Sequence, residues 1–244
     1  MRRTWQERYL ERFYDRSAGW VDGTTEFHGL CAAVLPPRAR ILELGPGRRN
    51  PTSRFLATLG EVHGLDPDPA AGANESLRSA AVLEGEVFPC GTETFDACVS
   101  NYVIEHVEDP AAHLREVRRV LRPGGAYVFR TPNRFHYVAV AASLAPHWVH
   151  RRVANRLRNL APEAGDPHRT LYRMNSRRAV RRLAAEAGLV VEQLRLVEKE
   201  PSYGMASRVL FLAFTAYERA VNATAAAAGL RANLFGVLRK PVGA

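Results

Sequence analysis

A short stretch near the start of the chain combines an acidic residue with two glycines. Glu43 is followed by Gly45 and Gly47, and then by Asn50 and Pro51. Glycine lets the backbone approach a ligand where a Cβ would collide, and Asn followed by Pro is typical of a helix start. The pattern predicts a turn between a strand and a helix, which would bind a nucleotide-type ligand through backbone atoms and a helix N-terminus.

Two glycine templates come close to this turn. The dinucleotide fingerprint GxGxxG needs a third glycine where Asn50 stands, and the template ExGxGxG needs one where Arg49 stands. The turn therefore indicates a nucleotide without identifying it, and a tight structural turn is the other interpretation. Asp66 closes the next apolar run, where its carboxylate can accept hydrogen bonds from both hydroxyls of a ribose, unless it only starts the turn DPDP.

Short apolar runs alternate with helical patterns along the chain, which is typical of a parallel sheet covered by helices. Asp109 and Pro110 predict the start of a helix that ends at RPGG, residues 122–125, where the chain is expected to turn into the next strand. A later helix is predicted from a cap at Asn175 to Gly188. The predicted strands are 41–44, 62–65, 80–83, 95–99, 126–129, 190–197 and 233–239, and the apolar segment 205–221 is expected to be largely buried.

Length and composition suit one α/β domain. The chain has 244 residues, of which 46% are apolar. Three irregularly spaced cysteines favour a reducing compartment over a disulfide framework. The N-terminus lacks the apolar core of a signal peptide, and no apolar run reaches the roughly 18 residues of a membrane span. We therefore expect a soluble, cytoplasmic protein.

Four strings then occur in a familiar order: ELGPG, GLDPD, FDACVSNYVIEHVEDP and RVLRPGG. On these strings the chain resembles the class I S-adenosylmethionine (SAM)-dependent methyltransferase superfamily, most strongly over residues 38–131 and again over 172–197. The pair EH after the fourth strand and RPGG before the fifth distinguish it from dinucleotide-binding dehydrogenases. The strings EHVEDP and TPNR are similar to those of methyltransferases that act on quinone precursors, sugars and other small natural products.

The resemblance implies an α/β Rossmann-like fold. Its doubly wound sheet would have seven strands, six parallel and one antiparallel, with helices on both faces. Residues 1–37 would form a helical cap over the cofactor, and residues 38–244 the methyltransferase domain. Within that domain we expect a helical insertion near 134–170, which would build the acceptor pocket, and an apolar helix near 205–226.

The resemblance also implies a donor site for SAM. Glu43 would face the amino group of the donor, and Asp66 would hold its ribose. Arg49 replaces the family's third glycine, so we expect its side chain to point out of the turn. Glu84 stands where the family usually has an aspartate near the adenine amine, with Glu86 as a rival. The complete predicted set is Glu43, Gly45, Gly47, Asp66, Pro67 against the adenine, Glu84, and Asn101 and Tyr102 at the methionine end.

Methyl transfer from a sulfonium is mainly a positioning problem, and a base is needed only for a weakly acidic acceptor. His106 follows the fourth strand at the edge where ligands sit, so it is the leading candidate for that base. It could instead brace the loop, with His136 or His168 as the base. We predict no metal, because Tyr102 stands where some quinone-precursor methyltransferases have a carboxylate beside the Glu-His pair.

The acceptor has three interpretations. We favour a small, fairly apolar molecule, methylated on oxygen in natural product biosynthesis, with His136 and Trp148 as contacts. RNA is the runner-up, because ten arginines lie within residues 151–182, although few aromatic residues accompany them and a solvated helix face would explain several of them. A lipid-like or quinone-type acceptor at a membrane surface is the third, supported by the apolar patch at 134–157 and its flanking arginines. A sensor that only binds the donor is the non-enzymatic interpretation.

Overall fold

The structure is a computed structural model of the chain, and it describes residues 4–144, 170–201 and 204–243. The chain forms two compact units, which we describe separately. The sheet unit comprises Phe27–Pro132, Thr170–Arg195 and Leu234–Ala244. The helical unit comprises Met1–Glu26, Asn133–Arg169 and Leu196–Asn233.

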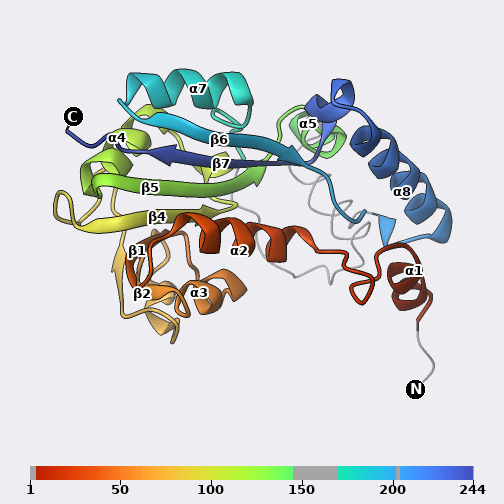
Figure 1. Cartoon of the computed structure of the whole chain (residues 1–244), viewed down its shortest axis with the longest axis horizontal. Helices are drawn as coiled ribbons and strands as arrows, with labels where there is room; N and C mark the ends of the chain where they lie inside the picture. The colour runs from red at the N-terminus through yellow and green to blue at the C-terminus, as the bar shows by residue number, and fades with distance from the viewer. Residues whose placement is uncertain (1–3, 145–169, 202–203, 244) are drawn as a thin grey trace. The chain divides into compact units, whose positions relative to one another are not determined.

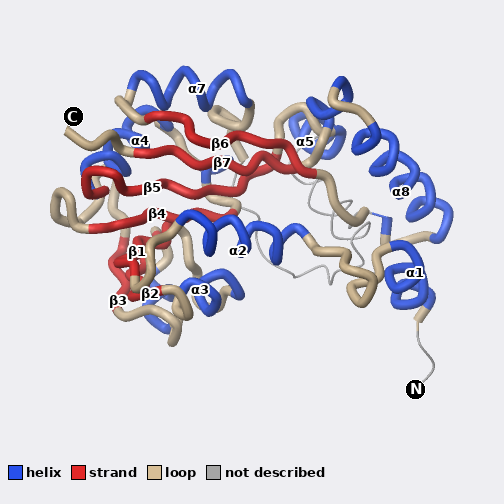
Figure 2. Tube along the Cα trace, viewed as in Figure 1, coloured by secondary structure: helices blue, strands red, loops and turns tan. Residues whose placement is uncertain are grey.

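A seven-stranded sheet with the order β3-β2-β1-β4-β5-β7-β6 organises the sheet unit (Figures 1 and 2). Strands β1 to β5 pair in parallel, whereas β7 runs opposite to β5, because Gly124 N donates to Lys240 O and Lys240 N to Gly125 O, both at 2.9 Å. The predicted Rossmann-like class is confirmed. The strands are β1 (Ala39–Leu44), β2 (Gly60–Asp66), β3 (Ser79–Val82), β4 (Phe95–Asn101), β5 (Leu121–Pro132), β6 (Val190–Val197) and β7 (Asn233–Arg239).

The central strands are apolar on both faces, as expected for a parallel sheet covered by helices. In β1, Ile41, Leu42 and Leu44 are all buried, and β4 buries Cys98 and Val99 beside them. The edge strand β3 is short and mostly exposed. The core of this unit therefore lies around β1, β4 and β5.

Helices cover the sheet and build the other unit. Contacts join α3 to β2, and join α4 to both β5 and α7. Figure 1 shows α7 running alongside β6. The helices are α1 (Trp5–Phe13), α2 (Gly23–Val34), α3 (Pro51–Leu56), α4 (Pro110–Val120), α5 (Tyr137–Leu144), α7 (Arg177–Glu186) and α8 (Arg208–Ala223), with short 3-10 turns η1 (Pro69–Ala73), η2 (Ile104–His106) and η4 (Ala226–Leu230).

Two of the three predicted helix caps are confirmed, and one is wrong. Asn50 and Asp109 cap α3 and α4 as predicted, each with a proline in the first turn. The prediction that Asn175 caps α7 is wrong, because Ser176 does so by accepting a hydrogen bond from Ala179 N at 3.2 Å. Both residue types are good caps, and the buried side chain of Asn175 instead bonds to the end of β5.

Two further expectations are corrected. The RPGG string lies within the irregular start of β5, where Gly124 adopts φ +77°, rather than in a turn before the strand. The segment 205–221 is not largely buried: in α8 the residues Phe211, Thr215, Glu218 and Val221 are buried, whereas Val209 is 75% exposed. A surface helix buries only one of its faces, and the remaining apolar residues of α8 lie on its other faces.

Aromatic rings form the core of the helical unit. Phe211 of α8 packs edge-on against Trp5 and Tyr9 of α1, with ring centroids 6.2 and 5.6 Å away. Tyr14, just after α1, donates from its hydroxyl to Thr215 and Glu218. These contacts hold α1 against α8.

Candidate functional site

The turn after β1 has the left-handed backbone that glycine favours. Gly45 adopts φ +68° and Gly47 φ +60°. A Cβ on Gly45 would lie 2.5 Å from Val103 Cγ2, whereas a Cβ on Gly47 would meet nothing within 4 Å. Position 45 therefore needs glycine both because of its left-handed backbone and because a Cβ would collide with Val103. At Gly47 there is open space beside the backbone.

Asp66, at the end of β2, is oriented by two backbone amides. Its Oδ2 accepts from Gly47 N at 2.9 Å and its Oδ1 from Asp68 N at 2.8 Å. The side chain is buried, and each carboxylate oxygen retains another lone pair. The structure thus brings the second glycine and this acid into direct contact and presents two acceptors side by side.

Glu43 is a buried acid with an unsatisfied oxygen. It is 2% exposed, and its Oε2 has no hydrogen-bond partner. Burial raises the pKa of Glu43 to about 7; the neighbouring Ser53 hydroxyl opposes this rise, and the charge of Asp66 adds to it. Buried acceptors normally have partners, so Oε2 is suited to a donor group supplied by a ligand, above all a cationic one.

Asn101 and Tyr102 follow β4 and are held by neighbours. Asn101 Nδ2 donates to Thr52 Oγ1 at 3.0 Å, and Asn101 Oδ1 accepts from Arg130 Nε at 2.7 Å. The Arg130 guanidinium lies 4.4 Å from the centroid of the Tyr102 ring. This cation–π contact supports the left-handed backbone of Tyr102, which has φ +62°.

Pro67 and Glu84 lie at the same edge of the sheet as Asp66. Leu83 N, next to Glu84, donates to Asp66 O at 3.0 Å. The side chains of Pro67, Glu84 and Glu86 are all exposed. The roles of Pro67 and Glu84 beside the adenine, and the choice between Glu84 and Glu86, stay predictions.

The candidate histidines are in different units. His106 ends η2 in the sheet unit, where it is half-buried and its backbone N donates to Val103 O at 2.9 Å. His136 is buried in the helical unit, with Nε2 3.5 Å from Glu198 Oε2. Burial lowers the pKa of His136 to about 4 and raises that of Glu198 to about 8, so both groups are neutral near pH 7. His168 and Trp148 lie outside the described residues.

Comparison with known proteins places the chain in a family. A family model described as a methyltransferase domain matches residues 9–194, well over half of the chain. This chain belongs to that methyltransferase family. The match covers the glycine turn, Asp66 and the segment after β4, so the SAM-dependent class inferred from the sequence strings is confirmed.

Curated relatives and solved structures agree with this assignment. The methyltransferase is 32% identical to a ubiquinone biosynthesis O-methyltransferase of Cereibacter sphaeroides over 136 residues, 52% of this chain and 55% of that protein. It is 28% identical to a 2-methyl-6-phytyl-1,4-hydroquinone methyltransferase of Oryza sativa, over 50% of this chain and 38% of that protein. The chain thus spans about half the length of the curated relatives it matches first.

A solved structure supports the fold across nearly the whole chain. Geranyl diphosphate C-methyltransferase from Streptomyces coelicolor, solved with S-adenosyl-L-homocysteine (SAH), superposes with a TM-score of 0.56 at 18% identity. The superposition covers 94% of this chain and 84% of that one. At this identity, the likeness concerns the fold alone.

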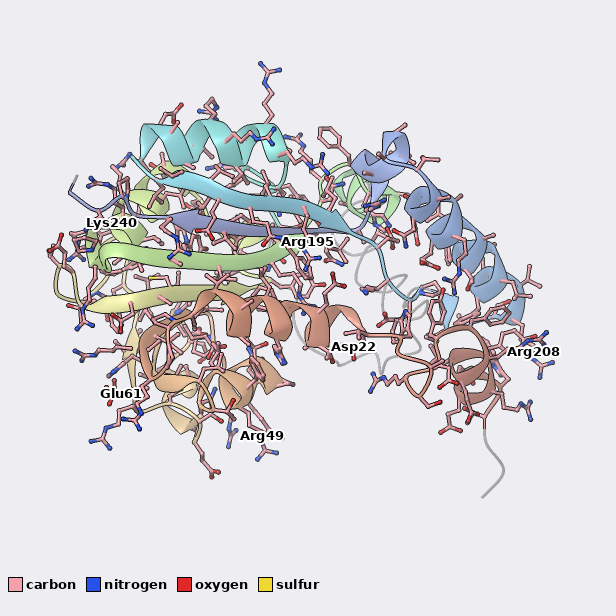
Figure 3. The ribbon with its side chains drawn as sticks, viewed as in Figure 1. Asp22, Arg49, Glu61, Arg195, Arg208 and Lys240 are labelled. Atoms are coloured by element: carbon pink, nitrogen blue, oxygen red, sulfur yellow. The ribbon has the colours of Figure 1, made fainter. Side chains whose placement is uncertain are left out.

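The described residues fit SAM, the methyl donor of this class. The donor carries an ammonium group that would satisfy the orphaned Oε2 of Glu43, and two ribose hydroxyls that match the paired acceptors of Asp66. The open space beside Gly47 lets a ligand reach the turn. The third-glycine position is filled by Arg49, whose exposed side chain points away from the sheet, as expected (Figure 3).

Glu105, which precedes His106, is buried in the methyltransferase and is held there by hydrogen bonds. Its Oε2 accepts from Thr131 Oγ1 at 2.8 Å, and Thr131 Oγ1 accepts from Asn175 Nδ2 at 2.6 Å. Its backbone carbonyl accepts from Leu171 N at 2.6 Å. Across the described ranges, no three His, Cys, Asp or Glu side chains are grouped so as to hold a metal ion.

Sequence reasoning missed several residues that shape this site. Arg130 is 5% exposed at the end of an apolar strand, and an arginine in such a strand is the signal that could have identified it. Thr52 and Asn74 gave no such signal, since a polar residue beside a turn is ordinary in any sequence. Asn74 donates to the Gly47 carbonyl at 3.1 Å.

Proposed function

We propose that this protein moves a methyl group from SAM to an oxygen of a small, fairly apolar acceptor, in natural product or quinone-type metabolism. The observation that carries the donor part is the unpartnered Oε2 of Glu43 beside the left-handed glycine turn and Asp66. The acceptor class is supported by the two relatives named for quinone-type substrates.

The chain's own residues would mainly bind and orient. When bound, SAM would supply an electrophilic methyl group on a sulfonium, and a nucleophile in line with the carbon–sulfur bond would accept this methyl group while SAH leaves. Glu43 would pair with the donor's ammonium, and Asp66 would accept from the ribose hydroxyls. Gly47 would let the donor lie against the backbone. Asn101 and Tyr102, held by Arg130, would border the methionine end.

His106 would take the proton of a hydroxyl acceptor. It lies directly after Glu105, whose side chain and carbonyl are both fixed by hydrogen bonds. As the acceptor oxygen bonds to the methyl carbon and the carbon–sulfur bond breaks, the hydroxyl proton would pass to the imidazole and then to solvent. An imidazole titrates near neutral pH, so it can accept a proton under ordinary conditions.

The RNA alternative rests on the basic stretch at 151–182, of which residues 170–182 are described. Arg178, Arg181 and Arg182 are exposed on α7, opposite buried Val180 and Leu183. An amphipathic helix has such a charged face without any ligand. We therefore prefer the small acceptor.

The membrane-surface alternative keeps the same chemistry with a lipid-like or quinone-type acceptor, and the relatives' names support it equally. Among the described helices, none combines the length and apolar character that crossing a bilayer requires. A cytoplasmic location stays a prediction from the sequence.

A methyl-transfer assay tests the proposal. Purified protein with radiolabelled SAM is offered catechols and hydroquinones of increasing chain length, with bulk RNA as a competing acceptor. We expect label in an extractable small product, and none with the Glu43→Gln variant. Label in RNA that falls steeply with salt would support the RNA alternative, because phosphate contacts release counterions. A protein that binds neither SAM nor SAH would contradict the donor assignment.

A further inference from the structure

We infer that Asn74 is a positioning residue for the donor site, which holds Gly47 beside Asp66 and Ser53 beside Glu43 without contacting the donor. The inference rests on the proposed donor-binding roles of Glu43 and Asp66. Asn74 follows η1 and is 6% exposed. Nothing in its sequence neighbourhood marks it as functional.

The side chain of Asn74 has a partner at each of its polar atoms. Nδ2 donates to Gly47 O and to Ser53 Oγ, both at 3.1 Å. Oδ1 accepts from Ser76 N, also at 3.1 Å. An amide group offers two donors and one acceptor atom, so the side chain is fully engaged and its position is fixed.

The first connection runs through Gly47 to Asp66. Gly47 N donates to Asp66 Oδ2 at 2.9 Å, and Gly47 O accepts from Asn74 Nδ2. The two polar groups of this one residue are therefore held by two separate side chains, on either side of a Cα with φ +60°. Without Asn74, the carbonyl of Gly47 would lose its restraint, and the backbone torsions of Gly47, which set the direction of the amide that orients Asp66, would be less constrained.

The second connection runs through Ser53 to Glu43. Ser53 is fully buried, and its Oγ accepts from Asn74 Nδ2 at 3.1 Å. Burial raises the pKa of Glu43, and the neighbouring Ser53 hydroxyl lowers it, so Ser53 favours the ionised form that an ammonium group requires. By donating to the Ser53 oxygen, Asn74 fixes the position of this neighbour of Glu43.

One amide group thus holds a neighbour of each acid, Gly47 for Asp66 and Ser53 for Glu43. Such preorganisation raises affinity, because the site does not have to be ordered when the ligand binds. The turn has Arg49 in the third-glycine position, and its backbone is restrained by the side chain of Asn74, which lies outside the turn.

The variant Asn74→Asp tests this role with the least change of shape. Aspartate keeps Oδ1 for Ser76 N but replaces the donating amide with an oxygen that faces Gly47 O. We expect the Kd for SAM and for SAH to rise about tenfold or more, and kcat at saturating donor to stay within about twofold. As pH falls, the carboxylate introduced by Asn74→Asp becomes protonated, and its hydroxyl can again donate a hydrogen bond. The ratio of the donor Kd of the variant to that of wild type should therefore decrease at low pH.

Asn133→Asp is the matched control. Asn133 is 1% exposed, donates to Gly229 O and Arg231 O at 2.7 and 2.8 Å, and accepts from the amide two residues later, Phe135 N, at 3.2 Å. It has the same hydrogen-bond pattern as Asn74, within the helical unit. Its variant should lose thermal stability while the donor affinity of the folded protein is unchanged.

The outcomes separate the possibilities. If Asn74→Asp lowers Tm as Asn133→Asp does but leaves donor affinity unchanged, Asn74 is only structural and the inference is overturned. A fall in kcat without a change in Kd would also overturn it. Should Asn74→Asp fail to fold, Ser53→Ala breaks one connection alone and should still weaken SAH binding several-fold; unchanged binding would overturn the inference. A wild-type protein that binds neither SAM nor SAH would instead refute the proposed function.

Discussion

The carboxylate of Asp66 and the backbone amide of Gly47 are joined by a hydrogen bond of 2.9 Å. This bond links the ends of two neighbouring strands, since Asp66 ends β2 and Gly47 lies in the turn after β1. The acid therefore shapes the turn as well as offering acceptors to a ligand. Removing it should cost more than the loss of two ligand contacts.

Asp66→Ala should weaken SAM and SAH binding by about 10² or more. Two hydrogen bonds from hydroxyls to a charged acceptor contribute about 1.5 to 3 kcal/mol each, and the glycine turn loses its restraint as well. Isothermal titration calorimetry measures the change. Unchanged affinity would remove Asp66 from the donor site, and tight binding of NAD by the wild type would contradict the donor assignment.

Donor affinity should depend on the ionisation of Glu43. Its pKa lies near 7, and an ammonium group binds the ionised form, so affinity should fall about tenfold per pH unit well below pH 7. Glu43→Gln should bind donor weakly at every pH and lose most of this dependence. SAH titrations at pH 5.5 to 8.5 would reveal it, and parallel curves for the two proteins would show that another group is responsible.

The same residue should lower the stability of the unliganded protein at high pH. The folded-state pKa of Glu43 is raised from 4.5 to about 7, so its stabilising contribution is complete below pH 4.5 and is lost as pH rises through 7. The Tm of Glu43→Gln minus the Tm of wild type should thus be larger at pH 8 than at pH 5. Thermal melts at both pH values measure this gain. A constant Tm difference would contradict the pKa assigned here.

Thr131→Val should destabilise the protein and leave donor affinity nearly intact. Valine has the same shape, but it leaves Glu105 Oε2 and Asn175 Nδ2 without the hydroxyl that both contact. Each buried group left unsatisfied costs about 1 to 3 kcal/mol. Urea unfolding measures the loss, and Thr131→Ser, which retains the hydroxyl, should recover most of it.

His106→Ala should lower turnover of a hydroxyl acceptor by about 10² to 10⁴ with donor affinity unchanged. The expected drop reflects loss of a general base, and a pH–rate profile that loses its acidic limb would support this role. Equal losses in turnover and donor binding would indicate instead that His106 braces the loop. Wild-type turnover across pH 6 to 9 would exclude it from the mechanism.

Much of the fold could be predicted because it depends on local signals. Continuous apolar runs fix the strands of a buried sheet, and Asn50 and Asp109 cap their helices through short-range geometry. Asn175 and Ser176 were indistinguishable at that level, because only the tertiary bond of Asn175 to Pro132 O decides between them.

Residues of the candidate site could be predicted only where a chemically informative residue type stands at the carboxyl end of a predicted strand. Glu43 and Asp66 stand at strand ends, where acids are informative in any sequence. Asn74 contacts Gly47 across 27 positions of the chain, and no local pattern reports such a bond. The direction of the Arg130 side chain likewise depends on Asn101 and Tyr102, which a neighbouring strand brings beside it.

The strand order has a consequence for synthesis on the ribosome. β7 lies between β5 and β6, although it follows both along the chain. Until residues 233–239 have emerged, β5 and β6 each present an unpaired edge, which is a ready template for pairing with other chains. The nascent protein would then depend on its last strand to close the sheet, and loss of that segment should yield an aggregating product rather than a smaller, active one.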